Sequence, residues 1–163
     1  MAKKKPVVTN AMRMLNAAKI SYDLVEYEHE GEIGDHFGME ISEMTGIAPE
    51  TAFKTLVARG EKQGIMVVCV PVNAEVDLKK LAKAAGDKRV EMIHVKELLG
   101  LTGYVRGGVS PIGMKKKYPT HFDETAQLWE EIAVSAGERG HQMIVPPEDL
   151  AKLTDAEFVD IIL

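Results

Sequence analysis

A lysine within an otherwise apolar stretch is the first candidate for chemistry. Lys54 lies in the segment 53–58, Phe-Lys-Thr-Leu-Val-Ala, where strand alternation places it on the same face as Leu56 and Ala58. That face is expected to point inward. A cation held there could neutralise a phosphate or the charge that develops on a carbonyl oxygen. The plain alternative is an edge-strand lysine that extends to solvent.

A glycine pair and two serines are the next candidates. Gly107 and Gly108 are adjacent, and residues without a Cβ let backbone N–H groups approach a ligand closely. The same pair could equally be a simple bulge in a strand. Ser110, before Pro111, and Ser135 could each line a cleft with a hydroxyl or belong to an ordinary turn.

Other common kinds of site find little support. His29 and His36 lie in an acidic, glycine-containing stretch without a recurrent metal-ligand spacing, which favours a solvated loop. Cys69 is the single cysteine, which excludes an internal disulfide and a multi-cysteine zinc site, and its apolar strand predicts an inert thiol. We expect no metal and no cofactor, and no protein nucleophile is evident.

The elements that must position these residues alternate irregularly between strands and short helices. Apolar spacing, N-caps and glycine stops predict helices over 10–18, 37–45, 78–85, 94–99 and 147–153. Alternating or continuous apolar runs predict strands over 22–27, 53–59, 65–72, 89–92, 104–111, 120–123, 132–135, 143–145 and 158–162, the segment 104–111 being broken by its glycines.

This order has no repeating βαβ unit, so it predicts an α+β fold with a mixed, strongly curved β-sheet and short interleaved helices. The 163 residues, of which 45% are hydrophobic and 28% charged, suit one domain spanning 1–163. No apolar run is long enough for a membrane span, so we expect a soluble, cytoplasmic protein.

The net charge of −5 argues against a nucleic-acid partner only if the charge is evenly spread. It is not. Residues 78–117 hold ten basic and three acidic side chains, a balance of +7, whereas 23–50 hold nine acidic and no basic ones. This segment, 78–117, is named the basic block here. It is compatible with a phosphate-bearing partner that binds one side of the protein, or with a solvated lysine-rich face.

Several segments together are more specific than any one of them. They are 53–56 (Phe-Lys-Thr-Leu), 102–104 (Thr-Gly-Tyr), 107–113 (Gly-Gly-Val-Ser-Pro-Ile-Gly), and Ser135 with Gly137 before Arg139-Gly140. The combination resembles the YbaK-type aminoacyl-tRNA deacylases, free-standing relatives of the editing domain inserted in bacterial prolyl-tRNA synthetases. The resemblance covers nearly the whole chain.

The resemblance implies hydrolysis of the ester that joins a wrong amino acid, most often cysteine, to tRNA(Pro). It also implies that the thiol of the cysteine substrate attacks its own carbonyl, so that the protein mainly positions and stabilises. The resemblance implies tRNA(Pro) charged with cysteine as the partner and prolyl-tRNA synthetase as a further candidate. It implies neither DNA nor a membrane.

Carried onto this sequence, the resemblance implies three groups of residues. Lys54, Gly107, Gly108 and Ser135 would be catalytic. Lys54 would hold the phosphate of the terminal adenosine or the ester region, and the glycines would be backbone donors to the carbonyl. Tyr27, Phe37, Thr55 and Ser110 would bind the substrate. The phosphates of the tRNA acceptor stem would contact the basic block through Lys79, Lys80, Lys83, Lys88, Arg89, Lys115, Lys116 and Lys117.

Two alternatives stay open. Pocket size could instead select alanine or another small residue mischarged on tRNA(Pro). A protein without catalytic activity could also use the same pocket to bind tRNA or a synthetase. Ala136 stands where the family often has glycine, which leaves the detailed role of Ser135 open.

Overall fold

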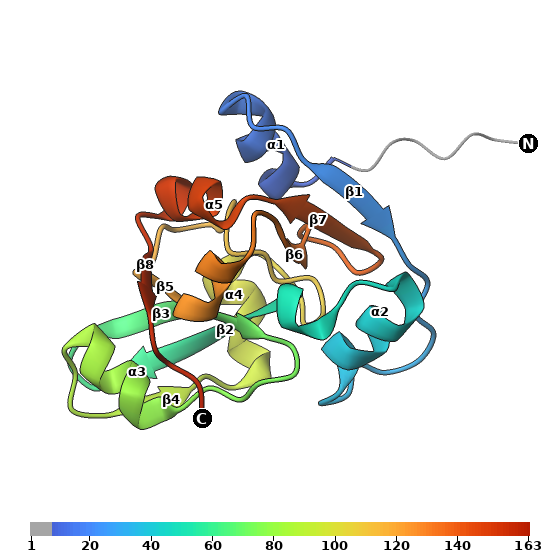
Figure 1. Cartoon of the computed structure of the whole chain (residues 1–163). Coiled ribbons are helices and arrows are strands. Elements are labelled where there is room, and N and C mark those ends of the chain that lie inside the picture. The colour runs from blue at the N-terminus through green and yellow to red at the C-terminus, as the bar shows by residue number, and fades with distance from the viewer. Residues whose placement is uncertain (1–7) are drawn as a thin grey trace, which may run out of the picture.

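Two β-sheets form the frame of the computed structural model, which describes residues 8–163 (Figure 1). The start of the predicted domain, residues 1–7, lies outside the described residues. The helices are α1 (Asn10–Ala17), α2 (Phe37–Thr45), α3 (Leu78–Ala85), α4 (Leu98–Thr102) and α5 (Pro147–Thr154), with short 3-10 helices at Pro49–Thr51, Val95–Glu97 and Glu124–Leu128. The strands are β1 (Asp23–Glu26), β2 (Phe53–Gly60), β3 (Gly64–Pro71), β4 (Val90–Met92), β5 (Thr120–Asp123), β6 (Ile132–Ser135), β7 (His141–Val145) and β8 (Glu157–Val159).

The larger sheet has the strand order β4-β2-β3-β5-β8 and mixes two directions. Strands β2 and β3 form an antiparallel hairpin, in which Phe53 pairs with Pro71 and Gly60 with Gly64. Strands β5 and β8 then add in parallel. The smaller sheet, β1-β7-β6, is antiparallel throughout, and a bridge between Ala52 and Ala133 connects it to the larger one. The predicted α+β class is confirmed, with its strands divided between two sheets.

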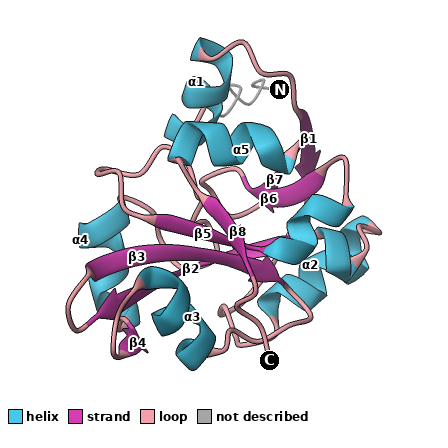
Figure 2. Cartoon of the chain, turned by 60° about the vertical axis from the view of Figure 1, so that its left-hand side comes forward, coloured by secondary structure: helices cyan, strands magenta, loops and turns pink. Residues whose placement is uncertain are grey.

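The two faces of the β2–β3 hairpin pack against different layers (Figure 2). One face joins the main core, where Phe53 and Cys69 pack with residues of the smaller sheet and with Leu15 of α1 and Leu150 of α5. The other face is covered by α3, whose Leu81 belongs to a second cluster. The hairpin is therefore apolar on both sides, as the almost continuous apolar run of β3 predicts.

Helix boundaries follow local capping chemistry. The Thr9 hydroxyl accepts the Met12 N–H at the start of α1, and Asp77 does the same for α3. Helices α2 and α3 end at Gly46 and Gly86, which adopt the left-handed conformation with φ of 75° and 70°. These helices match the predicted ranges 37–45 and 78–85.

The predicted strand over 104–111 is wrong. Residues 105–108 form a turn in which the Gly108 N–H donates to the Val105 carbonyl, and Gly107 has φ 86°. This is the geometry of a type II turn, which requires a positive φ at its third residue and so favours glycine there. The Tyr104 hydroxyl donates to the Ile112 carbonyl at 2.6 Å and helps to close the loop that follows.

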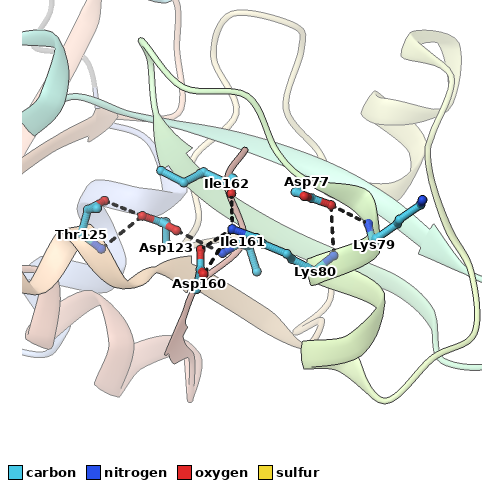
Figure 3. A network of polar contacts seen from close by, with 8 residues as sticks. All are labelled: Asp77, Lys79, Lys80, Asp123, Thr125, Asp160, Ile161 and Ile162. Atoms are coloured by element: carbon cyan, nitrogen blue, oxygen red, sulfur yellow. Dashed lines mark hydrogen bonds and ion pairs between the residues drawn. The ribbon is translucent and has the colours of Figure 1, made fainter.

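The final segment, 157–163, closes one edge of the larger sheet and is named the C-terminal strap here (Figure 3). Its Ile161 N–H donates to the buried Asp123 carboxylate, and its Ile161 carbonyl accepts the Asp77 N–H. Lys80 of α3 donates to Asp160 and to the Ile162 carbonyl. The strap thus connects β5 to the start of α3.

No helix within residues 8–163 has the length and apolarity required to cross a bilayer.

Candidate functional site

A cavity of about 460 Å³ opens between α2, the start of β2, the segment 92–98 and the turn 105–108. Apolar side chains form most of its wall, including Ile33, Phe37 and Leu98. Its polar and charged lining consists of Asp35, Lys54, Thr55, Arg106, Ser135 and Gln142. A mostly apolar cavity with a few convergent polar groups is typical of a small-molecule site.

Lys54 lies in the wall of this cavity at the beginning of β2. As predicted, it shares a strand face with Leu56 and Ala58, which pack toward the second cluster under α3. Its side chain is 26% exposed, and its Nζ lies 3.8 Å from the Glu75 carboxylate. Glu75 is largely exposed, so this ion pair contributes little to stability and leaves the ammonium available.

Three uncharged polar side chains line the cavity from β2, β6 and β7. Thr55 lies on β2, where its hydroxyl is 3.6 Å from the Cys69 thiol. Ser135, the last residue of β6, pairs across the strands with Gln142 of β7. The Ser135 hydroxyl accepts the Gly137 N–H at 3.2 Å. All three line the cavity.

Gln142 has an unusual environment among these residues. Its relative exposure is only 8%, and its Oε1 has no hydrogen-bond partner within the described part of the chain. A buried carbonyl oxygen without a partner is costly, because it has lost its hydration and gained nothing in return. Because Gln142 lines the cavity, a small rotation of its side chain would bring this acceptor to a bound ligand.

Of the two predicted backbone donors, Gly107 and Gly108, one lines the cavity and the other does not. Gly107 lines the cavity. Gly108 does not contribute to the lining, and the turn already occupies its N–H, so its predicted role as a free donor is corrected. A Cβ on Gly108 would lie 3.1 Å from the backbone of Glu138 and Arg139, so this glycine allows two chain segments to approach closely.

The predicted aromatic wall consists of one residue with a second behind it. Phe37 lines the cavity. Tyr27 is not in the lining but packs edge-on against Phe37 with ring centroids 6.1 Å apart, in a small cluster that includes Ile41. Burial raises the pKa of the Tyr27 phenol. Tyr27 therefore supports the wall from behind, and its predicted contact with substrate stays a prediction.

Ser110, which was predicted to bind substrate, lies behind the cavity wall. It is fully buried and outside the cavity lining, and its hydroxyl has no partner among residues 8–163. The neighbouring Val109 lines the cavity instead.

The basic residues predicted to contact phosphate divide into two groups. Lys80 is half-buried and bound to the C-terminal strap, so it has a structural partner. The others have exposed side chains: Lys79, Lys83, Lys88, Arg89, Lys115, Lys116 and Lys117. Two of them form surface ion pairs, Arg89 with Glu91 and Lys117 with Asp155.

The described residues contain neither a reactive thiol nor a cluster of metal-ligating side chains. Burial raises the pKa of the Cys69 thiol to about 12, so at neutral pH it is protonated and inert. No group of three or more metal-ligating side chains occurs within residues 8–163. His29 contacts Glu40 at 3.0 Å and packs edge-on against Phe37.

Sequence reasoning missed Asp35, Arg106 and Gln142 as lining residues. Gln142 directly precedes the predicted strand 143–145, and antiparallel pairing of that strand with 132–135 would have placed it opposite Ser135. Arg106 belongs to the basic block and adjoins the glycine pair, which was the available signal. No sequence signal distinguished Asp35 from the other acidic residues around it.

Comparison with known proteins gives concordant results. Residues 30–153 match the family described as the aminoacyl-tRNA editing domain. A protein of Enterococcus faecalis, named as a Cys-tRNA(Pro)/Cys-tRNA(Cys) deacylase, is 50% identical over 163 residues, covering 99% of this chain and 98% of that protein.

Solved structures show the same fold. One described as a trans-editing enzyme for prolyl-tRNA synthetase has a TM-score of 0.78 at 24% identity, covering 97% of this chain and 99% of that one. Another, of a hypothetical protein, has a TM-score of 0.84 at 19% identity, covering 94% and 99%.

Proposed function

This chain belongs to the aminoacyl-tRNA editing domain family, and from that membership we propose that it is a free-standing deacylase that removes cysteine from mischarged tRNA(Pro). The observation that carries the proposal is the 50% identity, over 99% of the chain, to a protein named for this activity. The name of that relative also includes Cys-tRNA(Cys), which is therefore a second substrate to test.

The reaction we propose uses the thiol of the substrate. Its sulfur bonds to the carbonyl carbon, the ester C–O bond breaks, and the thiol proton moves to the ribose oxygen. The products are a cyclic thioester, which water then opens, and free tRNA. The inert Cys69 is consistent with this route, because the cavity needs only to hold the thiol and the carbonyl in a reactive geometry.

Each polar group of the wall has a role in this proposal. Lys54 and Gly107 stabilise the charge that develops on the carbonyl oxygen. Thr55 and Ser135 fix the ester between the strands. The unpartnered Gln142 Oε1 accepts a hydrogen bond from the α-ammonium group of the aminoacyl ester, which satisfies both partners.

The exposed basic residues of 78–117 would hold the acceptor stem, with Lys80 excepted because the strap occupies it. A chain that contributes one editing domain could receive its tRNA identity from the acceptor end or from prolyl-tRNA synthetase. We place this work in the cytoplasm, where tRNA is charged.

Deacylation of a panel of charged tRNAs tests the proposal. Purified protein is incubated with Cys-tRNA(Pro), Cys-tRNA(Cys), Ala-tRNA(Pro) and correctly charged Pro-tRNA(Pro), and the remaining ester is measured over time. We expect fast loss of cysteine and little loss of alanine or proline. Lys54→Ala should abolish the loss of cysteine, and Lys152→Ala, an exposed lysine on α5, is the matched control.

Each alternative has its own result. Faster loss of alanine than of cysteine would assign the site to alanine instead. Absence of hydrolysis with every tRNA, together with retained tRNA binding, would make this chain a binding module. Full activity of Lys54→Ala would locate the chemistry elsewhere.

A further inference from the structure

The cavity wall has three charged residues, and two of them face each other. Asp35, Lys54 and Arg106 are the charged members of the lining. Arg106 donates through one guanidinium nitrogen to Asp35 Oδ1 at 3.4 Å. The Arg106 side chain is 41% exposed, and that of Asp35 is 94% exposed. The pair is therefore exposed to solvent, in contrast to the buried Gln142.

The backbone of Arg106 is fixed although its side chain is not. Its carbonyl accepts the Arg139 Nε at 2.8 Å, and the adjoining turn is closed by the Gly108 N–H and the Val105 carbonyl at 2.9 Å. A rigid turn with a half-exposed arginine lets the guanidinium change partner without movement of the main chain.

The contact with Asp35 is easily exchanged. It is a single, long hydrogen bond to an almost fully exposed carboxylate, and solvent screens such pairs strongly. Four of the five N–H donors of the guanidinium have no part in it. A phosphate, in contrast, can accept two parallel hydrogen bonds from the same fork.

A phosphate is also what the substrate would bring to this position. If the cavity holds the aminoacyl ester, the 3′-terminal nucleotide is covalently attached at its mouth, with its 5′-phosphate a short distance away. We propose, on the basis of the proposed function, that Arg106 binds the 5′-phosphate of the substrate's terminal nucleotide. Its hydrogen bond to Asp35 breaks when the phosphate binds. Asp35 then acts as a competitor that substrate must displace.

Minimal esters that differ by one phosphate test this inference. The substrates are 3′-O-cysteinyl-adenosine with and without a 5′-phosphate, and kcat/KM is measured for both. We expect wild-type protein to prefer the phosphorylated ester roughly 10-fold or more, since a charge-assisted hydrogen bond is lost in the other. Arg106→Gln should bring the ratio close to one while hydrolysis of the unphosphorylated ester continues. Arg13→Gln, an exposed arginine on α1, is the matched control.

Binding without turnover gives a second readout. Adenosine 5′-monophosphate should inhibit wild-type protein better than adenosine does, and Arg106→Gln should remove the difference. Asp35→Asn should strengthen inhibition by the monophosphate about two- to threefold, because the competing carboxylate is gone. Arg106→Lys should keep part of the preference, since it retains the charge but not the fork.

The possible failures are distinguishable. If neither ester is hydrolysed, and mischarged tRNAs are not hydrolysed either, the proposed function fails. If both esters are hydrolysed equally well by wild-type protein, or if Arg106→Gln keeps the full preference for phosphate, the function stands and the assignment of Arg106 is overturned.

Discussion

Gln142 is the residue whose environment most directly calls for a ligand, because its amide oxygen is buried without a partner. We expect Gln142→Met to lower kcat/KM on Cys-tRNA(Pro) about 10-fold, the loss of one hydrogen bond to a charged group. N-acetylcysteinyl-tRNA(Pro) lacks the ammonium group, so the variant and the wild-type protein should hydrolyse it with the same kcat/KM. Gln127→Met, an exposed position, is the control. An equal loss on both substrates would mean that Gln142 only supports the fold.

Replacement of Cys69, unlike that of Gln142, should leave deacylation nearly unchanged. Burial raises the pKa of its thiol to about 12, so alkylation by iodoacetamide should be very slow in native protein and fast after unfolding. Cys69→Ala should retain deacylation within about twofold, although lost packing should lower the free energy of unfolding by about 1 kcal/mol. If the variant folds but hydrolyses nothing, the attacking thiol belongs to the protein and not to the substrate.

The sequence was enough to find Lys54, Phe37, Thr55, Gly107 and Ser135 as lining residues, because each lies in a short motif or on a predictable strand face. It did not distinguish lining residues from those directly behind them. Whether Tyr27 touches a ligand or lies behind Phe37 depends on how two loops fold over each other. The fate of the Gly108 N–H depends on turn type, which strand periodicity does not reveal.

The C-terminal strap gives a structural role to Lys80, which the charge distribution had assigned to tRNA binding. Lys80 donates to Asp160 and to the Ile162 carbonyl. We expect Lys80→Met to lower the free energy of unfolding by about 1 kcal/mol and to change tRNA affinity little. The neighbouring Lys79, whose side chain is exposed, should show the reverse pattern as Lys79→Met. Urea unfolding and a tRNA binding assay measure the two effects, and identical behaviour of the variants would contradict this division.

Strand β5 carries a pH-dependent element. Burial lowers the pKa of His121 below its ordinary 6.5, with Glu157 opposing part of the shift, so the folded protein favours the neutral ring. Stability from this group is present above pH 6.5 and is lost as the pH falls through the lowered folded-state value. The free energy of unfolding should therefore fall as the pH drops below about 6.5, and it should fall more than in His121→Gln. Parallel pH profiles for the two proteins would rule this out.

Helices and strands with strong local signals were predictable to within a residue or two. Helix α3 has an N-cap, a periodic apolar stripe and a glycine stop, so its ends are fixed locally. The segment 104–111 was not predictable in this way. Val105 and Val109 would share one face of a strand, but the Arg139 side chain, from a distant part of the chain, donates to the Arg106 carbonyl and stabilises a turn.

On the scale of the whole molecule, the exposed lysines should make tRNA binding steeply salt-dependent even though the net charge is −5. Replacing Lys115 and Lys116 with glutamate should weaken binding and reduce the slope of log affinity against log salt by roughly 0.7 to 0.9 for each lost phosphate contact. Lys152→Glu, on the acidic C-terminal part of the chain, is the control. A flat salt response, or equal weakening by the control, would remove the basic block from the interface.

The C-terminal strap also affects how the protein is made. Strand β8 pairs with β5, and the strap bonds to the main chain at Asp77 and at Glu75, the ion-pair partner of Lys54. Because residues 157–163 leave the ribosome after every other strand, the larger sheet stays open at this edge during synthesis. The nascent chain would therefore complete this edge of the sheet, and fix the main chain at Glu75 and Asp77, only once residues 157–163 are free to pair.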